Sequence, residues 1–472
     1  MRSRSRFKSL VVLVLIPLLV VLGVVAYVGW RQSVRGVQVV ATPPPLIGHK
    51  TPITIGLQAA RGNVAGAEVR LTQGGTTTVL ATHAGTPSPR VEIPATIDPS
   101  NLGVREGEAV IEVWARDDFW RPLPVNERAI AQFPVTIDLT PPRIEILGAT
   151  QYISPGGAGL IAFRAAEAAR ADVRIGNQSF PTFPYGPADK GARVALIALP
   201  HDFGGNAPMT VSAVDAAGNT AVRTVPAELK PRKFPHDTIE IKDALLEAKV
   251  PELLPQRPPA QSLVEGFLII NREQRRQAEE EKRTIGAKSA EQPLWTGAFV
   301  QPPNTKVFAN FAERRTYMYQ GRPIDTQVHF GYDLAATKHM AVPAANTGVV
   351  VFAGPLAIYG NTIVVDHGLG LQTLYAHLSR IDVKPGDKVE KSQEIGRSGT
   401  TGLAIGDHLH YEVLVHGTSV TPLEWWDGKW LRDRIAKPLK EAGLPALGGI
   451  DAPTEEAKPT PPASRPPRRG AR

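Results

Sequence analysis

The chain of 472 residues contains no cysteine, so no disulfide can cross-link its domains and no metal can be held by thiolates. It also lacks a serine nucleophile elbow at residues 396–400, where Gly-Arg-Ser-Gly-Thr does not have the Gly-x-Ser-x-Gly spacing. No nucleic-acid motif accompanies the net charge of +8, which suits an anionic polymer or a membrane surface. The composition, 42% hydrophobic and 21% charged residues, is that of a globular chain that can form sizeable cores. The length is enough for about three domains.

One long apolar run lies near the start of the sequence. Residues 9–30 carry no charge and are long enough to cross roughly 30 Å of hydrocarbon. Four basic residues precede the run and two, Arg31 and Arg35, follow it closely, which predicts a cytoplasmic N-terminus. We expect residues 1–36 to be a cytoplasmic stub and transmembrane anchor. A cleaved signal peptide is the alternative, against which stand the length of the run and the lack of a clear small-x-small cleavage site.

Residues 37–230 favour two β-domains, with boundaries at 37–138 and 139–230. Short alternating runs such as residues 109–114 are separated by Gly, Pro and Asn at intervals typical of a sandwich. Val113-Trp-Ala-Arg-Asp recurs about 100 residues later as Val211-Ser-Ala-Val-Asp, one module length. These modules resemble bacterial immunoglobulin-like repeats, which implies two β-sandwiches. We expect them to act as spacers, with binding of a glycan or a protein partner as the alternative.

Residues 231–290 predict a helical linker. Residues 237–248 have helical spacing, and Ser262 with Glu265 forms a candidate capping box. The charge-rich run 272–283 predicts an exposed helix that leads into the last domain. At the other end of the chain, residues 431–472 are predicted to be a disordered tail rich in Pro, Lys and Arg.

Histidines crowd into the region between the linker and the tail. Seven of the eleven lie between residues 328 and 416, in three motifs. These motifs are His329-Phe-Gly-Tyr-Asp333, Tyr375-Ala-His377 and His408-Leu-His410. Two imidazoles, one carboxylate and an open position for water are the ligand set of a catalytic zinc ion.

Backbone geometry agrees with a shared site. His408 and His410 stand at positions i and i+2 of a run rich in strand formers, so both should project from one strand face. The same alternation would put Tyr375 and His377 on one face of a neighbouring strand. The glycine between His329 and Asp333 suits a turn that brings both residues onto one ion.

The ordered motifs resemble the lysostaphin- and LytM-type zinc endopeptidases, which cleave the peptide part of bacterial peptidoglycan. The resemblance covers about 130 residues, from near 292 to 426. Three motifs in this order, with matching residues between them, are highly specific. It implies a β-rich duplicated-hybrid-motif metallopeptidase domain at residues 291–430, with one zinc ion per chain. The implied metal ligands are His329, Asp333 and His410.

The resemblance also implies two active-site histidines that do not bind the metal, His377 and His408. We assign His408 as the base and His377 as the partner of the oxyanion. For the other three histidines of the region, His339, His367 and His416, we predict ordinary polar roles.

The sequence therefore predicts a mainly β chain: a transmembrane helix, two immunoglobulin-like sandwiches, a helical linker and a metallopeptidase domain. The predicted function is that of a zinc metalloendopeptidase, anchored in the bacterial inner membrane with its catalytic domain in the periplasm or outside, that hydrolyses amide bonds of peptidoglycan stem peptides or cross-bridges. Two alternatives remain: a non-catalytic scaffold or activator of other wall hydrolases, and a general protease.

Arg314, Arg315 and Tyr317 are candidates for lining the groove, where an arginine could bind a peptide carboxylate. A solvated loop is the alternative for these residues.

Overall fold

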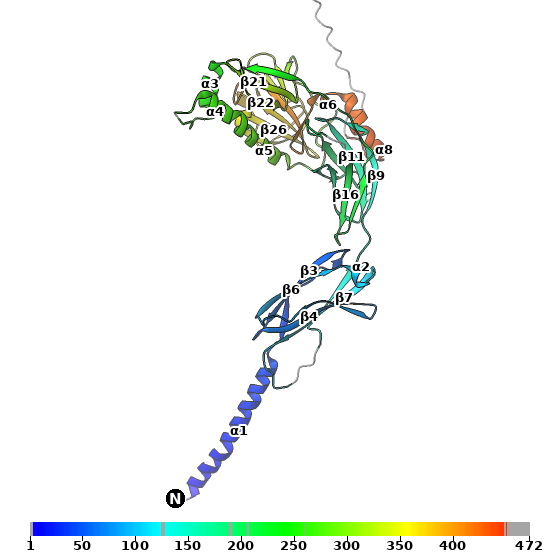
Figure 1. Cartoon of the computed structure of the whole chain (residues 1–472), viewed down its shortest axis with the longest axis vertical. Coiled ribbons are helices and arrows are strands. Elements are labelled where there is room, and N and C mark those ends of the chain that lie inside the picture. Colours follow the sequence, from blue (N-terminus) through cyan, green and yellow to red (C-terminus); the bar gives the residue numbers. More distant parts are fainter. Residues whose placement is uncertain are drawn as a thin grey trace, which may run out of the picture. The chain divides into compact units, whose positions relative to one another are not determined.

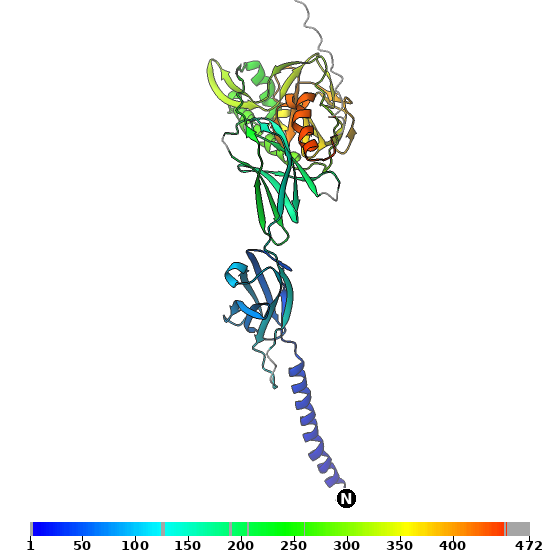
Figure 2. The ribbon, with the colours of Figure 1, turned by 90° about the vertical axis from the view of Figure 1, so that its right-hand side faces the viewer.

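The computed structural model describes residues 3–123, 128–187, 191–204, 207–258, 260–447 and 450, with side chains from residue 12 onward. The chain forms two compact units (Figures 1 and 2). The first takes in the residues up to Pro142 together with 167–170 and 214–221, and the second takes in the others.

A single apolar helix opens the first unit. Helix α1 spans Ser3–Ser33, and its segment Val12–Ser33 is 22 residues long with a mean hydropathy of 2.8. None of that segment is buried against the rest of the unit. Within the part of the chain that the structure describes, this is the one helix long and apolar enough to cross a membrane, so it is a signal sequence or a single membrane anchor.

The remainder of the first unit is built from two sheets. One has the order β1-β3-β6 and the other the order β2-β8-β7-β4-β5. Alternate residues of both sheets, such as Ile55 of β3 and Ile111 of β7, share one hydrophobic core, so the sheets pack face to face. Their elements are β1 Val37–Ala41, β2 Leu46–Ile47, β3 Thr51–Ala59, β4 Val64–Gln73, β5 Thr76–His83, β6 Arg90–Ile97, α2 Pro99–Leu102, β7 Gly107–Asp117 and β8 Ala131–Ile137.

A second β region follows the Thr-Pro-Pro junction. It has two four-stranded sheets, β14-β15-β11-β9 and β13-β12-β16-β17, and a short pair, β10-β18. Phe163 of β11 and Val211 of β16 are fully buried in a core that continues to Trp425 of the C-terminal domain. The strands are β9 Arg143–Ala149, β10 Tyr152–Ile153, β11 Ala158–Ala166, β12 Ala168–Ile175, β13 Gln178–Pro181, β14 Phe183–Pro184, β15 Ala192–Ala198, β16 Met209–Asp215, β17 Thr220–Thr224 and β18 Glu228–Leu229.

The linker is mainly helical and is packed onto the last domain. It begins with strand β19, His236–Glu240, which pairs in parallel with β21. Helix α4 starts at Ser262, where the capping box with Glu265 is confirmed. The prediction of an exposed helix over 272–283 is wrong for one face of α5, because Ala278 and Lys282 are buried there. The helices are α3 Asp243–Leu253, α4 Leu263–Ile269, the π-helix η2 Ile270–Gln274 and α5 Arg275–Gly286.

The last domain is organised around one sheet with the order β20-β23-β31-β27-β26-β25-β29, and β32 pairs with β31. Two three-stranded sheets, β19-β21-β22 and β24-β30-β28, lie beside it. The elements are β20 Lys306–Ala309, β21 Glu313–Tyr319, β22 Arg322–His329, β23 Tyr332–Ala335, β24 Ala341–Pro343, β25 Gly348–Pro355, η3 Ala357–Tyr359, β26 Asn361–Gly368, β27 Leu371–Ala376, β28 Arg380–Ile381, β29 Lys388–Val389, β30 Glu394–Arg397, β31 Leu409–Val415 and β32 Thr418–Val420.

The two faces of this sheet belong to different cores. Alternation along β31 puts Tyr411 and Val413 into the core shared with the second β region. Leu414 packs on the opposite face, in a core formed with the linker helices. His410 lies four residues before Leu414 in β31, so it is on the same face of the sheet, which the linker helices cover.

The predicted disorder is wrong for residues 431–447. Helices continue from Trp426 to Glu441: α6 Pro422–Trp426, α7 Gly428–Leu431, the π-helix η4 Arg432–Ala436 and α8 Lys437–Glu441. Leu431, Ile435 and Leu439 are spaced four apart and are at most 1% exposed, because this apolar stripe packs into the core of the second unit. Residues 451–472, the rest of the predicted tail, lie outside the described residues.

Candidate metal centre

Strand pairing brings the three predicted metal ligands together. Asp333 of β23 lies directly opposite His410 of β31 in the antiparallel register. His329 is the last residue of β22, and residues 330 and 331 turn the chain into β23. A Cβ on Gly331 would lie 2.6 Å from the Tyr411 carbonyl oxygen and 2.7 Å from Nε2 of His410, so only glycine allows this close approach.

The donor atoms of the three ligands face one another. Asp333 Oδ1 lies 2.9 Å from His329 Nε2 and 3.0 Å from His410 Nδ1, and the two nitrogens are 3.0 Å apart. These side chains form the one group of metal-ligating type found among the described residues, with donor atoms within 4.8 Å of one another. The arrangement is a His-Asp-His metal site.

The remaining polar atoms of the ligands are bound elsewhere. Nδ1 of His329 donates to the Asn310 carbonyl oxygen at 2.9 Å, and Nε2 of His410 donates to Glu412 Oε1 at 2.9 Å. The Arg315 guanidinium donates to Asp333 Oδ2 at 3.0 Å. Each ligand therefore has its orientation fixed from outside and presents a lone pair inward, which is the condition that a divalent cation requires.

Electrostatics favours the protonation states that bind metal. Burial lowers the pKa of His329, so that its imidazole is neutral. Burial opposes the charge on Asp333, but the facing His329 and the hydrogen bonds of the histidines hold the carboxyl pKa well below its usual range. For His410 burial favours the neutral form, yet hydrogen bonds to Asp333 and Glu412 raise its pKa above the ordinary value.

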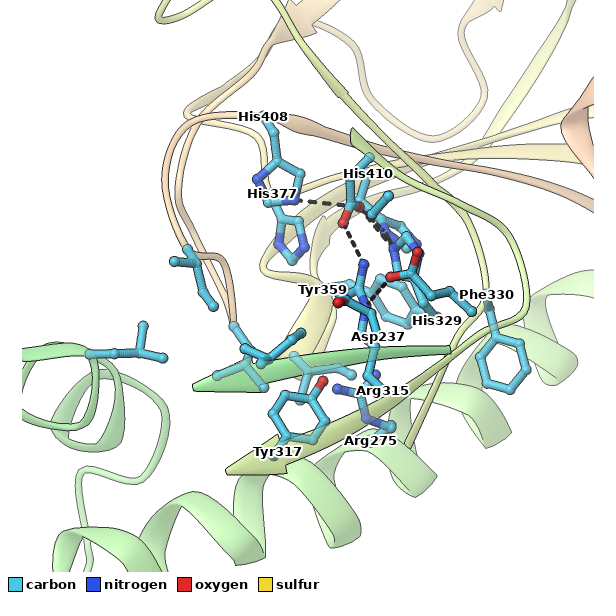
Figure 3. Close-up of a pocket in the computed structure, with 18 of the residues that line it drawn as sticks. Asp237, Arg275, Arg315, Tyr317, His329, Phe330, Tyr359, His377, His408 and His410 are labelled. Carbon is cyan, nitrogen blue, oxygen red and sulfur yellow. Dashed lines mark hydrogen bonds and ion pairs between the residues drawn. The ribbon is translucent and has the colours of Figure 1, made fainter. Parts of the chain in front are cut away.

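The other two predicted histidines lie beside the ligands in the same pocket (Figure 3). Nδ1 of His408 donates to the Gly406 carbonyl oxygen at 2.9 Å, and Nδ1 of His377 donates to the Thr401 carbonyl oxygen at 2.8 Å. Their ring centroids are 4.8 Å apart, and His408 Nε2 lies 3.5 Å from Asp333 Oδ1. Nδ1 of each ring is therefore committed, which leaves Nε2 as the atom that can act on a bound molecule, and Nε2 of His408 already contacts Asp333.

The route by which His377 enters the pocket differs from the prediction. Tyr375 lies in the core on the face of β27 opposite to that of His410, so strand alternation would have carried His377 away from the metal ligands. His377 instead follows the end of β27 with a left-handed φ of 60°, and its N–H donates to the Tyr359 carbonyl oxygen at 2.9 Å. A turn, not the strand, delivers this side chain.

The structure divides the remaining candidates. Arg315 and Tyr317 line the pocket, whereas Arg314 is exposed on the other face of β21. His339, His367 and His416 do not line the pocket and have hydrogen-bond partners of their own, as predicted.

Sequence reasoning missed Glu412 as the partner of His410, although their i, i+2 spacing on a strand could have indicated it. It also missed the pairing of Arg315 with Asp333. The second contact has no local sequence signature, because it depends on how strands β21 and β23 lie in the fold.

The pocket has a volume of about 290 Å³, and the linker forms part of its lining. Asp237, Leu245, Phe267 and Arg275, all from residues 231–290, line it together with the histidines. Figure 3 shows Arg275 and Tyr317 on the side of the pocket away from His377 and His408.

Comparison with known proteins agrees with this geometry. Residues 327–422 match the family described as Peptidase family M23. The C-terminal domain is an M23 peptidase domain. This lysostaphin- and LytM-type domain keeps the complete His-Asp-His metal-binding group. The family match does not extend to the modules that precede the domain.

Two of the curated proteins that match part of the chain have peptidoglycan or peptidase names. Peptidoglycan DD-endopeptidase ShyA of Vibrio cholerae is 39% identical over 121 residues, 25% of this chain and 27% of the relative. DD-carboxypeptidase/endopeptidase Mpg of Neisseria meningitidis is 40% identical over 97 residues, 21% of this chain and 22% of the relative. The chain thus spans about a quarter of the length of these relatives.

Among solved structures, the catalytic domain of lysostaphin from Staphylococcus simulans is 29% identical. The match covers 26% of this chain and 92% of that domain, with a TM-score of 0.23.

Proposed function

We propose that the chain is a zinc metalloendopeptidase that hydrolyses amide bonds in peptidoglycan stem peptides or cross-bridges. The observation that carries the proposal is the complete set of three inward-facing donor atoms beside two further histidines in one pocket. The names of the relatives support this substrate class, since ShyA is a peptidoglycan DD-endopeptidase.

The donor set fits zinc in kind and number. His329, Asp333 and His410 would hold one ion and leave a position open for water. Zinc bound there supplies a water of lowered pKa and polarises the scissile carbonyl.

The chain's own residues then move the protons. Nε2 of His408, with Nδ1 committed to the Gly406 carbonyl, can accept the proton of the attacking water. Burial lowers the pKa of His377 well below the usual range, and its Nδ1 donates to the Thr401 carbonyl oxygen. We assign His408 as the base, since its Nε2 lies 3.5 Å from Asp333 Oδ1 and so beside the proposed ion, and His377 as the remaining candidate for the oxyanion partner.

The main alternative is a non-catalytic scaffold or activator of other wall hydrolases. The intact ligand set favours the enzyme, because buried polar groups kept in this arrangement without an ion would be costly.

A general protease is the other alternative, and it differs from a wall enzyme only in its substrate. Digestion of cross-linked muropeptides beside casein separates the two, and cleavage of casein alone would reject the wall enzyme.

Separate measurements of zinc content and of turnover test the roles of the two histidines. We expect His408→Ala and His377→Ala each to retain one zinc ion per chain and to lose about 10²–10⁴-fold in kcat on muropeptides. His339→Ala, at an exposed histidine outside the pocket, is the control. Zinc-loaded wild type that cuts nothing would reject the enzyme in favour of a scaffold, and full activity of His408→Ala would reject its assignment as base.

For the rest of the chain we propose an anchor and spacers. We propose that residues 1–36 form a transmembrane anchor with the N-terminus in the cytoplasm, and that 37–138 and 139–230 are immunoglobulin-like modules between the anchor and the catalytic domain. The apolar helix and the two-sheet arrangement of each β region support this. Intact mass of the membrane-extracted chain tests the anchor, because cleavage after the apolar run would indicate a signal sequence instead.

A further inference from the structure

A buried lysine connects the linker to the metal centre. Lys282 of α5 lies outside the residues 327–422 that match the peptidase family, yet its side chain is only 1% exposed. Its ammonium donates to Glu412 Oε2 at 3.0 Å, Ser419 Oγ at 3.0 Å and the Tyr359 hydroxyl at 3.2 Å, and it pairs with Glu279 Oε2 at 2.7 Å. A lysine so completely buried needs such partners to remain charged.

Glu412 carries the connection from Lys282 to a metal ligand. Its Oε1 accepts from His410 Nε2 at 2.9 Å and lies 2.7 Å from the Tyr359 hydroxyl, and its Oε2 accepts from Lys282 and from Ser419 Oγ at 2.6 Å. Both oxygens are thus held in place. The opposite nitrogen of His410 is the one that faces Asp333 in the metal site.

Helix α5 is fixed to the strand that carries these residues. A Cβ on Gly286, the last residue of α5, would lie 2.4 Å from Gly417 Cα in the turn between β31 and β32. Just after the helix, the Gln372 side chain donates to the Lys288 carbonyl oxygen at 3.1 Å. Backbone contact at this point leaves Lys282 little freedom to move away from Glu412.

We propose that Lys282 is a positioning residue of the metal centre, which holds Glu412 against His410 and makes helix α5 part of the metal site. A carboxylate that accepts from a ligating imidazole fixes the ring and increases its basicity toward metal, and such partners typically change metal affinity by about 10–100-fold. The inference rests on the proposed zinc site and extends that site to a helix beyond the family match.

The test compares zinc affinity among variants of the full chain in detergent. Lys282→Met, Glu412→Gln and the double variant are measured by competition with a chromophoric chelator. The visible spectrum of the cobalt-substituted proteins reports the geometry around the ion, and thermal unfolding of the metal-free proteins reports stability. Lys391→Met is the control, at a lysine that is only partly buried and donates to the Ala298 carbonyl oxygen.

We expect Lys282→Met to weaken zinc binding about 10–100-fold and to alter the cobalt spectrum, with Lys391→Met unchanged. The double variant should bind zinc as weakly as the weaker single variant, because both residues act through one contact. Wild-type affinity and spectrum in Lys282→Met, even with a lowered melting temperature, would overturn the proposal, since a purely structural lysine behaves in that way.

The double variant also decides the matter if Lys282→Met does not fold, because it replaces Glu412, the fully buried one of the two carboxylates that the single change leaves without their ammonium partner. Equal zinc affinity in the double variant and Glu412→Gln supports the proposal, and a further tenfold loss in the double variant overturns it. Failure of zinc-loaded wild type to cut peptidoglycan would reject the proposed function and leave the result on zinc affinity standing.

Discussion

At the scale of single residues, the metal site depends on groups that hold the ligands from behind. Asp333 presents Oδ1 to the two histidines while Oδ2 is bound by Arg315, which also pairs with Glu313 at 3.0 Å. Because Arg315 is committed to these carboxylates, its first role is to orient a ligand and not to bind a peptide carboxylate.

Arg315→Met should therefore weaken zinc binding. The change leaves Asp333 Oδ2 buried without its donor and frees the carboxylate to rotate, so we expect about 10–100-fold lower affinity by chelator competition. Arg314→Met is the control on the same strand, at an exposed position. Equal losses in both variants would show that charge near the pocket, and not the contact with Asp333, is what matters.

At the scale of elements, the sequence predicts best what strands and motifs encode locally. The ligand set is what the family resemblance of the three ordered motifs implies, and alternation correctly places His408 and His410 in one pocket. Alternation fails for His377, because a single left-handed residue redirects the chain and no local signal marks it.

The same limit applies to helix α5. Its charged run is typical of a solvated helix, and the burial of Lys282 depends on Glu412, which lies 130 residues further along the chain. The prediction for residues 431–472 errs in the opposite direction. The Pro, Lys and Arg content of this segment favours disorder, although residues 431–439 carry an apolar stripe that is buried in the structure.

The docking of α5 gives a prediction at this scale. Gly286→Ala would force its Cβ against Gly417, so we expect a loss of about 1–3 kcal/mol in the free energy of unfolding. Zinc affinity should fall as well, since Lys282 moves with the helix. Gly354→Ala is the control, because a Cβ there meets only Phe352, at 3.9 Å. Chemical denaturation that shows the same stability for both variants would contradict the packing argument.

At the scale of the whole molecule, most of the second β region belongs to the same compact unit as the peptidase domain and shares its core. Glu424 of α6 lies at their junction, where Oε2 accepts from the Ala158 N–H at 2.9 Å. Burial raises the pKa of Glu424 from 4.5 to about 8, although Arg232 lies 3.8 Å away.

The raised pKa of Glu424 predicts how stability changes with pH. Between about pH 4.5 and 8 the folded chain holds a proton on Glu424 that the unfolded chain has lost, so stability falls as the pH rises. The slope from this group is at most about 1.4 kcal/mol per pH unit. Glu424→Gln should flatten the melting temperature of the metal-free protein over this range. Parallel curves for wild type and variant would contradict the assignment.

The central claim is a zinc-dependent amide hydrolase acting on peptidoglycan, and one measurement tests it most directly. Purified full-length chain, wild type beside His329→Ala and His410→Ala, is analysed for metal content and incubated with peptidoglycan, and the products are identified by mass. The account predicts one zinc ion per wild-type chain and release of shortened peptides, with both lost in each variant. A folded wild-type chain that holds no zinc and releases no peptide would contradict it.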